Sequence, residues 1–190
     1  SATDSIDEVR SRKAKIAWYL TSKSTLIPPD SMTPTMQKAL DIAMKDTAFT
    51  QFLKYNNRPI LCEVFSIYPI KPGDLTIKAS PFTYKIEVYN FARNAAILAF
   101  ADLEQKKLLS VRQVDQAQPD IPPSLQKIAL AIAIKSPEVK AALGYTPTEG
   151  NAQMASTKTS LNKTNCERSR HLCVAPTFVQ GDKALWVIVD

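Results

Sequence analysis

The sequence predicts an α+β fold made of two tandem units, each a helix followed by antiparallel strands. Three observations support this prediction. The helix-type spacing of apolar residues over 36–53 returns over 125–143. An apolar strand that closes on an aspartate occurs at 96–102 and again at 184–190. Between the two units lies a proline-rich segment, 116–123, which is typical of a domain boundary.

Capping residues predict where the first helices begin. A capping box over residues 5–8 predicts an amphipathic helix over 5–22, ahead of the first unit. Proline in the first turn predicts a second helix over 34–54, which Asp46 breaks or bends. The apolar residues of the amino-terminal helix fall near one face, and its basic residues are expected on the solvated face.

The second unit begins with a helix capped by Ser124. This helix should kink or restart at the Ser-Pro pair 136–137, and it should stop at Gly144, because glycine commonly ends helices. The segment 151–165 has little apolar content and is predicted to be a mobile loop. Asn162 within it begins an Asn-Lys-Thr glycosylation sequon.

Strands are predicted where apolar and polar residues alternate between proline, glycine or polar turns. They cover residues 60–68, 82–91, 96–103, 108–114, 172–179 and 184–189. Either the second sheet has one strand fewer than the first, or the polypeptide continues past Asp190. The predicted segments are an amino-terminal helix and proline linker over 1–30, a first repeat over 31–115, a linker over 116–123 and a second repeat over 124–190.

The net charge of +6 raises the question of nucleic-acid binding. The basic residues form two clusters: Arg10, Arg12, Lys13, Lys15, and Lys158, Lys163, Arg168, Arg170. Neither cluster is interleaved with the stacking aromatics that a nucleic-acid surface uses, so we expect no nucleic-acid partner. No apolar run approaches the roughly 20 residues of a membrane span, so none is expected.

The three cysteines predict one disulfide. Cys62 sits in a strand-like apolar run and is expected to be a buried thiol. Cys166 and Cys173 flank a short polar stretch that suits a disulfide and, with it, an oxidising compartment. Unpaired thiols are one alternative. A metal site with His171 is another, but structural zinc takes four ligands and the sequence places no fourth ligand nearby.

The sequence predicts no set of residues that could act together in catalysis. His171 is the one histidine, and the simplest interpretation of it is a hydrophilic surface residue. Asp102 and Glu104 lie at a strand end and a turn, where both are expected to be solvated. The four glycines are scattered and build no phosphate-binding loop, so no cofactor is expected.

Two stretches carry a resemblance to a known family. Residues 84–114, with Phe100-Ala101-Asp102-Leu103-Glu104 at their centre, resemble a strand-turn-strand of the small amino-terminal domains of copper amine oxidases. The link over 118–123 and the helix that ends in 136–143 resemble the connection into that family's next small domain. The resemblance covers most of residues 34–190 and implies two tandem cystatin-like repeats, each a helix packed on an antiparallel sheet and neither catalytic.

The family's chemistry does not carry over to these residues. Its catalytic domain needs three histidines for copper and an Asn-Tyr pair for the quinone cofactor, whereas this chain has only His171 and no such pair. Cystatin-like inhibitors of cysteine proteases use Gln-x-Val-x-Gly, and the nearest fragments, 113–115 and 179–181, do not match it.

The resulting expectation is a non-catalytic binding or structural module outside the cytoplasm, periplasmic or secreted. It would meet a protein partner or a second copy through sheet edges. It is either an accessory part of a longer amine-oxidase-like chain or a stand-alone interaction protein, with a cystatin-like inhibitor as the lesser alternative.

Overall fold

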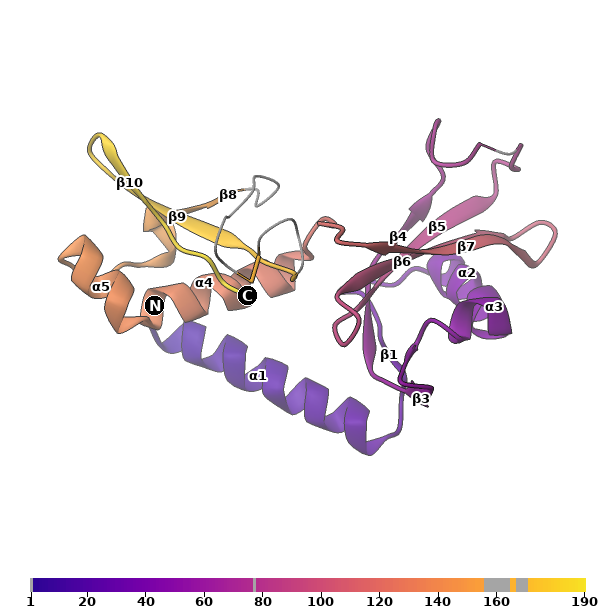
Figure 1. Cartoon of the computed structure of the whole chain (residues 1–190), viewed down its shortest axis with the longest axis horizontal. Helices are drawn as coiled ribbons and strands as arrows, with labels where there is room; N and C mark the ends of the chain where they lie inside the picture. The colour runs from indigo at the N-terminus through magenta and orange to yellow at the C-terminus, as the bar shows by residue number, and fades with distance from the viewer. Residues whose placement is uncertain (1, 77, 156–164, 167–170) are drawn as a thin grey trace. The chain divides into compact units, whose positions relative to one another are not determined.

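A computed structural model of the chain describes residues 2–76, 78–155, 165–166 and 171–190. It divides into two compact units (Figure 1). The five-stranded unit covers residues 19–117, and the three-stranded unit combines residues 1–18 with 118–190. Both units combine helices with strands, so the predicted α+β class is confirmed. The division at 117/118 falls inside the predicted linker, whereas the predicted separate segment 1–30 is shared between the units.

The five-stranded unit has a mixed sheet in the order β1-β4-β5-β6-β7, with β1 parallel to β4 and the other pairs antiparallel. A small hairpin, β2-β3, stands outside this sheet. The elements are β1 Leu26–Ile27, α2 Pro34–Met44, α3 Thr47–Thr50, β2 Lys54–Tyr55, β3 Arg58–Pro59, β4 Cys62–Pro69, β5 Thr83–Asn90, β6 Ala95–Asp102 and β7 Lys107–Asp115.

The helix predicted over 34–54 is two helices. It begins as expected, with Pro34 in the first turn and Thr33 Oγ1 accepting a hydrogen bond from the Met36 N–H at 3.3 Å. It ends at Met44, because Asp46 adopts an extended conformation. The Asp46 carboxylate accepts a hydrogen bond from the Ala48 N–H at 2.9 Å and so caps the short helix α3.

The core of the five-stranded unit lies between α2 and one face of the sheet. Ala39 and Ala43 are fully buried on α2, and Ile86 and Ile97 are fully buried in the central strands. Phe49 of α3 completes this cluster and is also fully buried. Burying each large apolar side chain contributes about 1.5–3 kcal/mol, so this packing holds α2 against the sheet.

The three-stranded unit has an antiparallel sheet in the order β10-β9-β8. Its elements are α1 Ala2–Thr21, which extends into the other unit, α4 Pro123–Lys135, α5 Pro137–Leu143, the 3₁₀ helix η1 Glu149–Asn151, β8 Ala152–Ala155, β9 Ala175–Gln180 and β10 Lys183–Trp186. The restart at Ser136 and the stop at Gly144, which has φ of 78°, occur as predicted. The start of α4 was misplaced, since its cap is Pro122 and not Ser124.

Phe178 of β9 is the centre of the three-stranded unit. It is fully buried and packs with Ile134 of α4 and with Val139 and Leu143 of α5. Strand β8 was missed, because residues 152–155 lie in the segment predicted as a loop. Most of that segment, including the Asn162 sequon, falls outside the described residues.

The apolar side chains of the amino-terminal helix are not buried where the structure describes them. From Asp7 onward, no described side chain of α1 is buried, and Trp18 and Leu20 are 63% and 61% exposed. The first basic cluster therefore lies on a helix whose described side chains all retain access to solvent. Within the described residues, none of the helices has the length and apolar character needed to cross a membrane.

Candidate functional site

A lysine-lined hollow is the main candidate site, and it lies in the five-stranded unit. A cavity of about 510 Å³ lies beside α2 and the turn between β6 and β7. We call it the lysine groove; it is lined by Thr35, Lys38, Asp41, Ile42, Lys45, Leu103 and Lys106. A second cavity of about 330 Å³ shares Ile42, Lys45 and Lys106 with it and adds Lys107.

One wall of the groove is formed by residues of α2 and its carboxyl end. Lys38, Ile42 and Lys45 are four and then three residues apart, so they follow one another along one face of α2. Asp41 lies on the same side, three residues after Lys38. The Thr33 cap and the buried opposite face of α2 fix this orientation.

The β6–β7 turn forms the other wall, and Asp102 shapes it. The Oδ1 atom of Asp102 accepts hydrogen bonds from the N–H groups of Glu104 and Gln105 at 2.9 and 3.0 Å. Asp102 is fully buried, so the expectation that it is solvated was wrong, whereas Glu104 is exposed. Lys106 closes the turn with φ of 52°, in the left-handed region.

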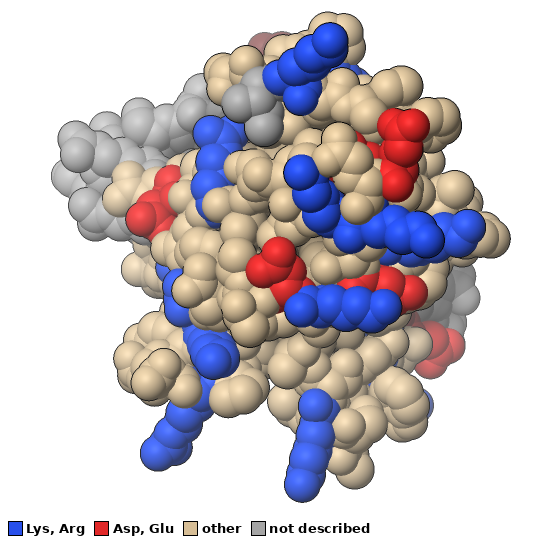
Figure 2. All heavy atoms as spheres, turned by 90° about the vertical axis from the view of Figure 1, so that its right-hand side faces the viewer, with Lys and Arg blue, Asp and Glu red and all other residues tan. Residues whose placement is uncertain are grey.

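The groove presents positive charge that lacks a partner. Three lysines and one aspartate line the larger cavity, and none of the three lysines forms an ion pair within the described residues. The carboxylate of Asp41 is instead engaged by Gln37, whose Nε2 donates to Oδ1 at 2.8 Å. Figure 2 shows Lys and Arg side chains outnumbering acidic ones on one face of the molecule.

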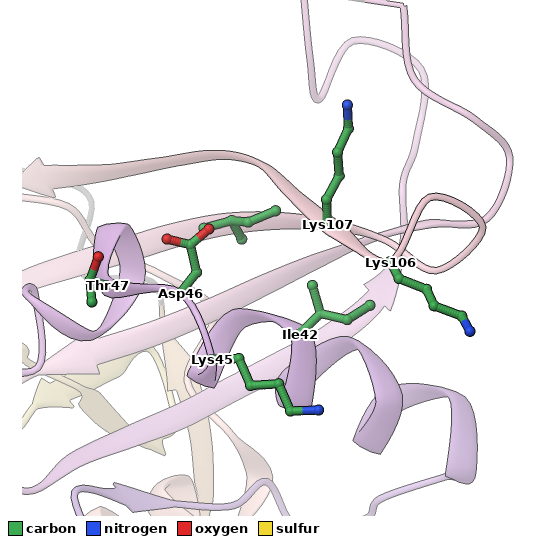
Figure 3. Close-up of a pocket in the computed structure, with 7 residues that line it drawn as sticks. Ile42, Lys45, Asp46, Thr47, Lys106 and Lys107 are labelled. Carbon is green, nitrogen blue, oxygen red and sulfur yellow. The ribbon is translucent and has the colours of Figure 1, made fainter.

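The lysines converge only in part. Figure 3 shows Lys45 reaching past Ile42 toward the side on which Lys106 projects, whereas Lys107 projects to the other side of the turn. The larger cavity is therefore lined by the two lysines that project to the same side, Lys45 and Lys106. Ile42 and Leu103 are half-buried and give it an apolar floor.

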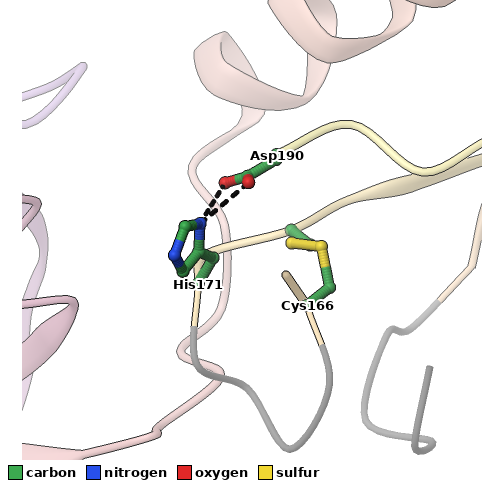
Figure 4. Close-up of polar contacts among 4 residues, drawn as sticks. Cys166, His171 and Asp190 are labelled. Carbon is green, nitrogen blue, oxygen red and sulfur yellow. Dashed lines mark hydrogen bonds and ion pairs between the residues drawn. A yellow bond between two sulfur atoms is a disulfide. The ribbon is translucent and has the colours of Figure 1, made fainter. Parts of the chain in front are cut away.

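A second polar cluster surrounds the disulfide of the three-stranded unit. Cys166 and Cys173 form the expected disulfide, and their Cα atoms are 6.0 Å apart. His171 is 38% exposed, and its Nδ1 lies 2.8 Å from Oδ2 of Asp190 (Figure 4). No local pattern in the sequence indicates this contact. Both cysteines near the histidine are oxidised, so neither offers a thiolate for nucleophilic chemistry.

Cys62, the third cysteine, is unreactive because it is buried. Cys62 is 1% exposed in β4, and burial raises the pKa of its thiol to about 12, although the nearby charge of Arg93 lowers it slightly. The thiol is therefore protonated at neutral pH, as expected of a core residue.

No family model matches the chain. No curated protein matches it either. The groove and the disulfide cluster are the features of the described residues that indicate a function. The second predicted basic cluster, Lys158, Lys163, Arg168 and Arg170, lies outside the described residues. The groove lysines were not singled out in the sequence, because helix 34–44 and the turn at 103–106 are brought together only by the packing of α2 on the sheet.

Proposed function

We propose that this chain is a non-catalytic binding module that acts outside the cytoplasm, and that the lysine groove holds an acidic segment of a partner protein. The observation that carries the proposal is that Lys38, Lys45 and Lys106 surround one cavity and form no ion pair with any residue that the structure describes. Like charges gathered around a hollow repel one another, and a bound carboxylate would relieve this repulsion.

The lining of the groove favours a peptide over a free ion. Ile42 and Leu103 offer apolar contact between the cations, and the aliphatic stems of the lysines extend it. A segment that alternates acidic and apolar side chains would use both features. Stacking aromatics are absent from the lining residues, which disfavours single-stranded nucleic acid.

The disulfide supports the location. Disulfides form and persist in oxidising compartments, and that of Cys166 and Cys173 is nearly buried, with both residues at most 4% exposed. A disulfide of this kind is typical of a periplasmic or secreted protein.

We further propose that the two units are repeats of one cystatin-like fold, as the resemblance to amine oxidase amino-terminal domains implies. In support, α2 packs on β4–β7, and α4 packs on β9 through Ile134 and Phe178. The chain would then be either an accessory part of a longer enzyme or a stand-alone protein. The mass of the native protein from its source, compared with 21.1 kDa, separates these two cases.

Strand addition at a sheet edge is the second candidate mode of binding. β10 is an edge strand of the three-stranded sheet, and no described strand pairs with its outer side. Val179 and Trp186 are 53% and 62% exposed beside this edge, which suits a protein partner or a second copy of the chain. Protease inhibition is a lesser alternative, because Val-Gln-Gly over 179–181, at the end of β9 and the start of the β9–β10 turn, does not match the inhibitor motif.

The groove can be tested with a labelled peptide that alternates glutamate and leucine, followed by fluorescence anisotropy. We expect saturable binding that weakens steeply at about 0.5 M salt, because exposed charges are screened over a few ångströms there. Lys45→Glu and Lys106→Glu should each weaken binding about tenfold, which corresponds to about 1.4 kcal/mol.

The matched control is Lys140→Glu, an exposed lysine of α5 whose reversal changes the net charge equally. Binding that falls as much in Lys140→Glu as in Lys106→Glu would mean that net charge, and not the groove, attracts the peptide. A matching lysine-leucine peptide should not bind.

A further inference from the structure

The surroundings of the disulfide include side chains that could bind a metal ion. The Sγ atoms of Cys166 and Cys173 and a carboxylate oxygen of Asp190 all lie within 4.8 Å of one another. The Nδ1 atom of His171 lies 2.8 Å from that same carboxylate. Two sulfurs and one carboxylate oxygen are thus gathered at one end of the β9–β10 hairpin, and the imidazole of His171 lies on the other side of that carboxylate (Figure 4).

Strand pairing explains why Asp190 is there. Val174 and Val189 exchange two backbone hydrogen bonds of 2.8 Å, in the same antiparallel register that pairs β9 with β10. One residue further along this register, Cys173 stands opposite Asp190. The fourth ligand that the sequence did not place is therefore supplied by the segment that follows β10.

The surroundings hold these groups in place. Cys166 and Cys173 are 4% and 1% exposed, so their sulfurs are shielded from bulk water. The side-chain Nε2 of Gln118 donates a hydrogen bond to the carbonyl oxygen of Cys173 at 3.0 Å. Asp190 and His171 remain partly exposed, at 44% and 38% of their side-chain surface, and they provide an entry path for an ion.

We propose that, when the disulfide is reduced, Cys166, His171, Cys173 and Asp190 bind a divalent cation of the zinc class. Zinc takes four such ligands in a tetrahedron, with bonds of about 2.0 Å to nitrogen and oxygen and 2.3 Å to sulfur. Neighbouring ligand atoms are then about 3.3–3.8 Å apart. The His171–Asp190 contact is slightly shorter than this spacing, and breaking the S–S bond frees the two sulfurs to reach it.

Reduction of the disulfide needs two electrons and two protons, and a dithiol reductant supplies both. The dithiol gives two electrons and two protons to the disulfide, which becomes two thiols, and the reductant becomes a cyclic disulfide. Each thiol then loses its proton as its sulfur binds the cation, so two protons are released for each ion bound. Oxidation closes the site again, because a disulfide sulfur is not a thiolate ligand. The metal site and the disulfide are therefore mutually exclusive states of the same residues.

Cobalt(II) is the probe that reports the ligands directly. The full chain is reduced with a phosphine without oxygen, freed of metal and titrated with Co²⁺. We expect one equivalent to bind, with a thiolate-to-cobalt charge-transfer band and the visible bands of a tetrahedral ion, and we expect Zn²⁺ to remove both. The oxidised chain should show neither band. Absence of the charge-transfer band in the reduced chain would overturn the proposal.

Variants assign the ligands one by one. Cys166→Ser and Cys173→Ser should lose most of the charge-transfer band, and Asp190→Asn and His171→Gln should bind Co²⁺ at least tenfold more weakly. Cys62→Ala is the matched control and should behave as the parent chain, because Cys62 is buried in the other unit. Asp190→Asn and His171→Gln keep both cysteines, so circular dichroism of their oxidised forms checks their folding. Unchanged affinity in both would remove them from the site and overturn the four-ligand assignment.

Discussion

Asp102 and Lys107 form the last residue pair of the β6–β7 ladder, and the buried carboxylate of Asp102 folds the turn that joins them. This arrangement sets where Lys106 and Lys107 leave the sheet. The turn and α2 are the two walls of the lysine groove. The position of the cations therefore depends on a single carboxylate that solvent does not reach.

Replacing Asp102 should destabilise the five-stranded unit. Asp102→Ala removes two hydrogen bonds and should lower the free energy of unfolding by about 1–2 kcal/mol, measured by urea denaturation, because it also removes the buried Oδ2 atom, which accepts no hydrogen bond within the described residues. Asp102→Asn keeps an accepting oxygen and should cost less than Asp102→Ala. Glu104→Ala, at an exposed position of the same turn, should change stability by less than about 0.5 kcal/mol. An equal loss in Asp102→Ala and Glu104→Ala would contradict this role.

Asn90 joins the end of β5 to the segment that follows α3. It is fully buried; its Nδ2 donates to the carbonyls of Phe52 and Lys54 at 2.9 and 3.2 Å, and its Oδ1 accepts from Ala92 and Arg93 at 3.1 Å. Asn90→Ala should lower the free energy of unfolding by about 2 kcal/mol, since the Phe52 carbonyl loses its donor, whereas the Lys54 carbonyl keeps the hydrogen bond from Arg93 Nε at 2.6 Å.

Asn90→Asp tests the contacts of the Asn90 amide group with the two carbonyls. It keeps the accepting oxygen but places a second carboxylate oxygen against the carbonyls of Phe52 and Lys54. The Arg93 guanidinium, whose Nε donates to the Lys54 carbonyl at 2.6 Å, favours the charged form, but we expect burial against two carbonyls to outweigh it and raise the folded pKa. Stability should then be greatest at low pH and should fall as the pH rises through that pKa. Stability of Asn90→Asp that does not fall between pH 4 and pH 8 would contradict the assigned contacts.

Thiol titration should distinguish the three cysteines. The native chain should expose no reactive thiol, because Cys62 is buried and its pKa is about 12. Unfolding without reductant should release one thiol, and reduction should release three. Three thiols before reduction would disprove the disulfide and, with it, the argument for an oxidising compartment.

Ser136 should link the stability of α5 to pH. Its Oγ accepts from the Val139 N–H at 3.4 Å and donates to Oε2 of Glu138 at 2.7 Å, and this hydrogen bond, with one from the backbone of Glu138, lowers the pKa of the carboxyl. The stabilisation should therefore be complete above the ordinary glutamate pKa of 4.5 and lost as the pH falls through the lower folded value.

The pH dependence can be separated from the cap itself. Ser136→Ala should lower the free energy of unfolding by about 1 kcal/mol at neutral pH and reduce this pH dependence, because only the backbone hydrogen bond to Glu138 remains, as followed by chemical denaturation at several pH values. Glu138→Gln should remove the pH dependence while keeping the Val139 hydrogen bond. A Ser136→Ala variant as stable as the parent chain would contradict the cap.

Local signals predicted the helices better than the site. Pro34, Ser136 and Gly144 act within one helical turn, so the sequence is sufficient to place the ends they form. Asp102 was misjudged because its burial depends on the neighbouring strands β5 and β7, which no local pattern reveals.

The polar clusters depend on contacts distant in sequence. Asp190 meets Cys173 through a strand register that begins at the β9–β10 turn, and a shift of one residue would separate them. The groove likewise needs α2 to pack on the sheet before Lys38 and Lys106 share a cavity. Residue types alone therefore indicated a basic protein with one disulfide, but neither cluster.

Chemical-shift mapping of the ¹⁵N-labelled chain with the glutamate-leucine peptide tests the central claim most directly. We predict that the shifted amide signals concentrate in residues 34–46 and 102–108, and that Lys106→Glu suppresses these changes. Shifts concentrated on β10, or spread over both units without preference, would contradict the assignment of the lysine groove as the binding site.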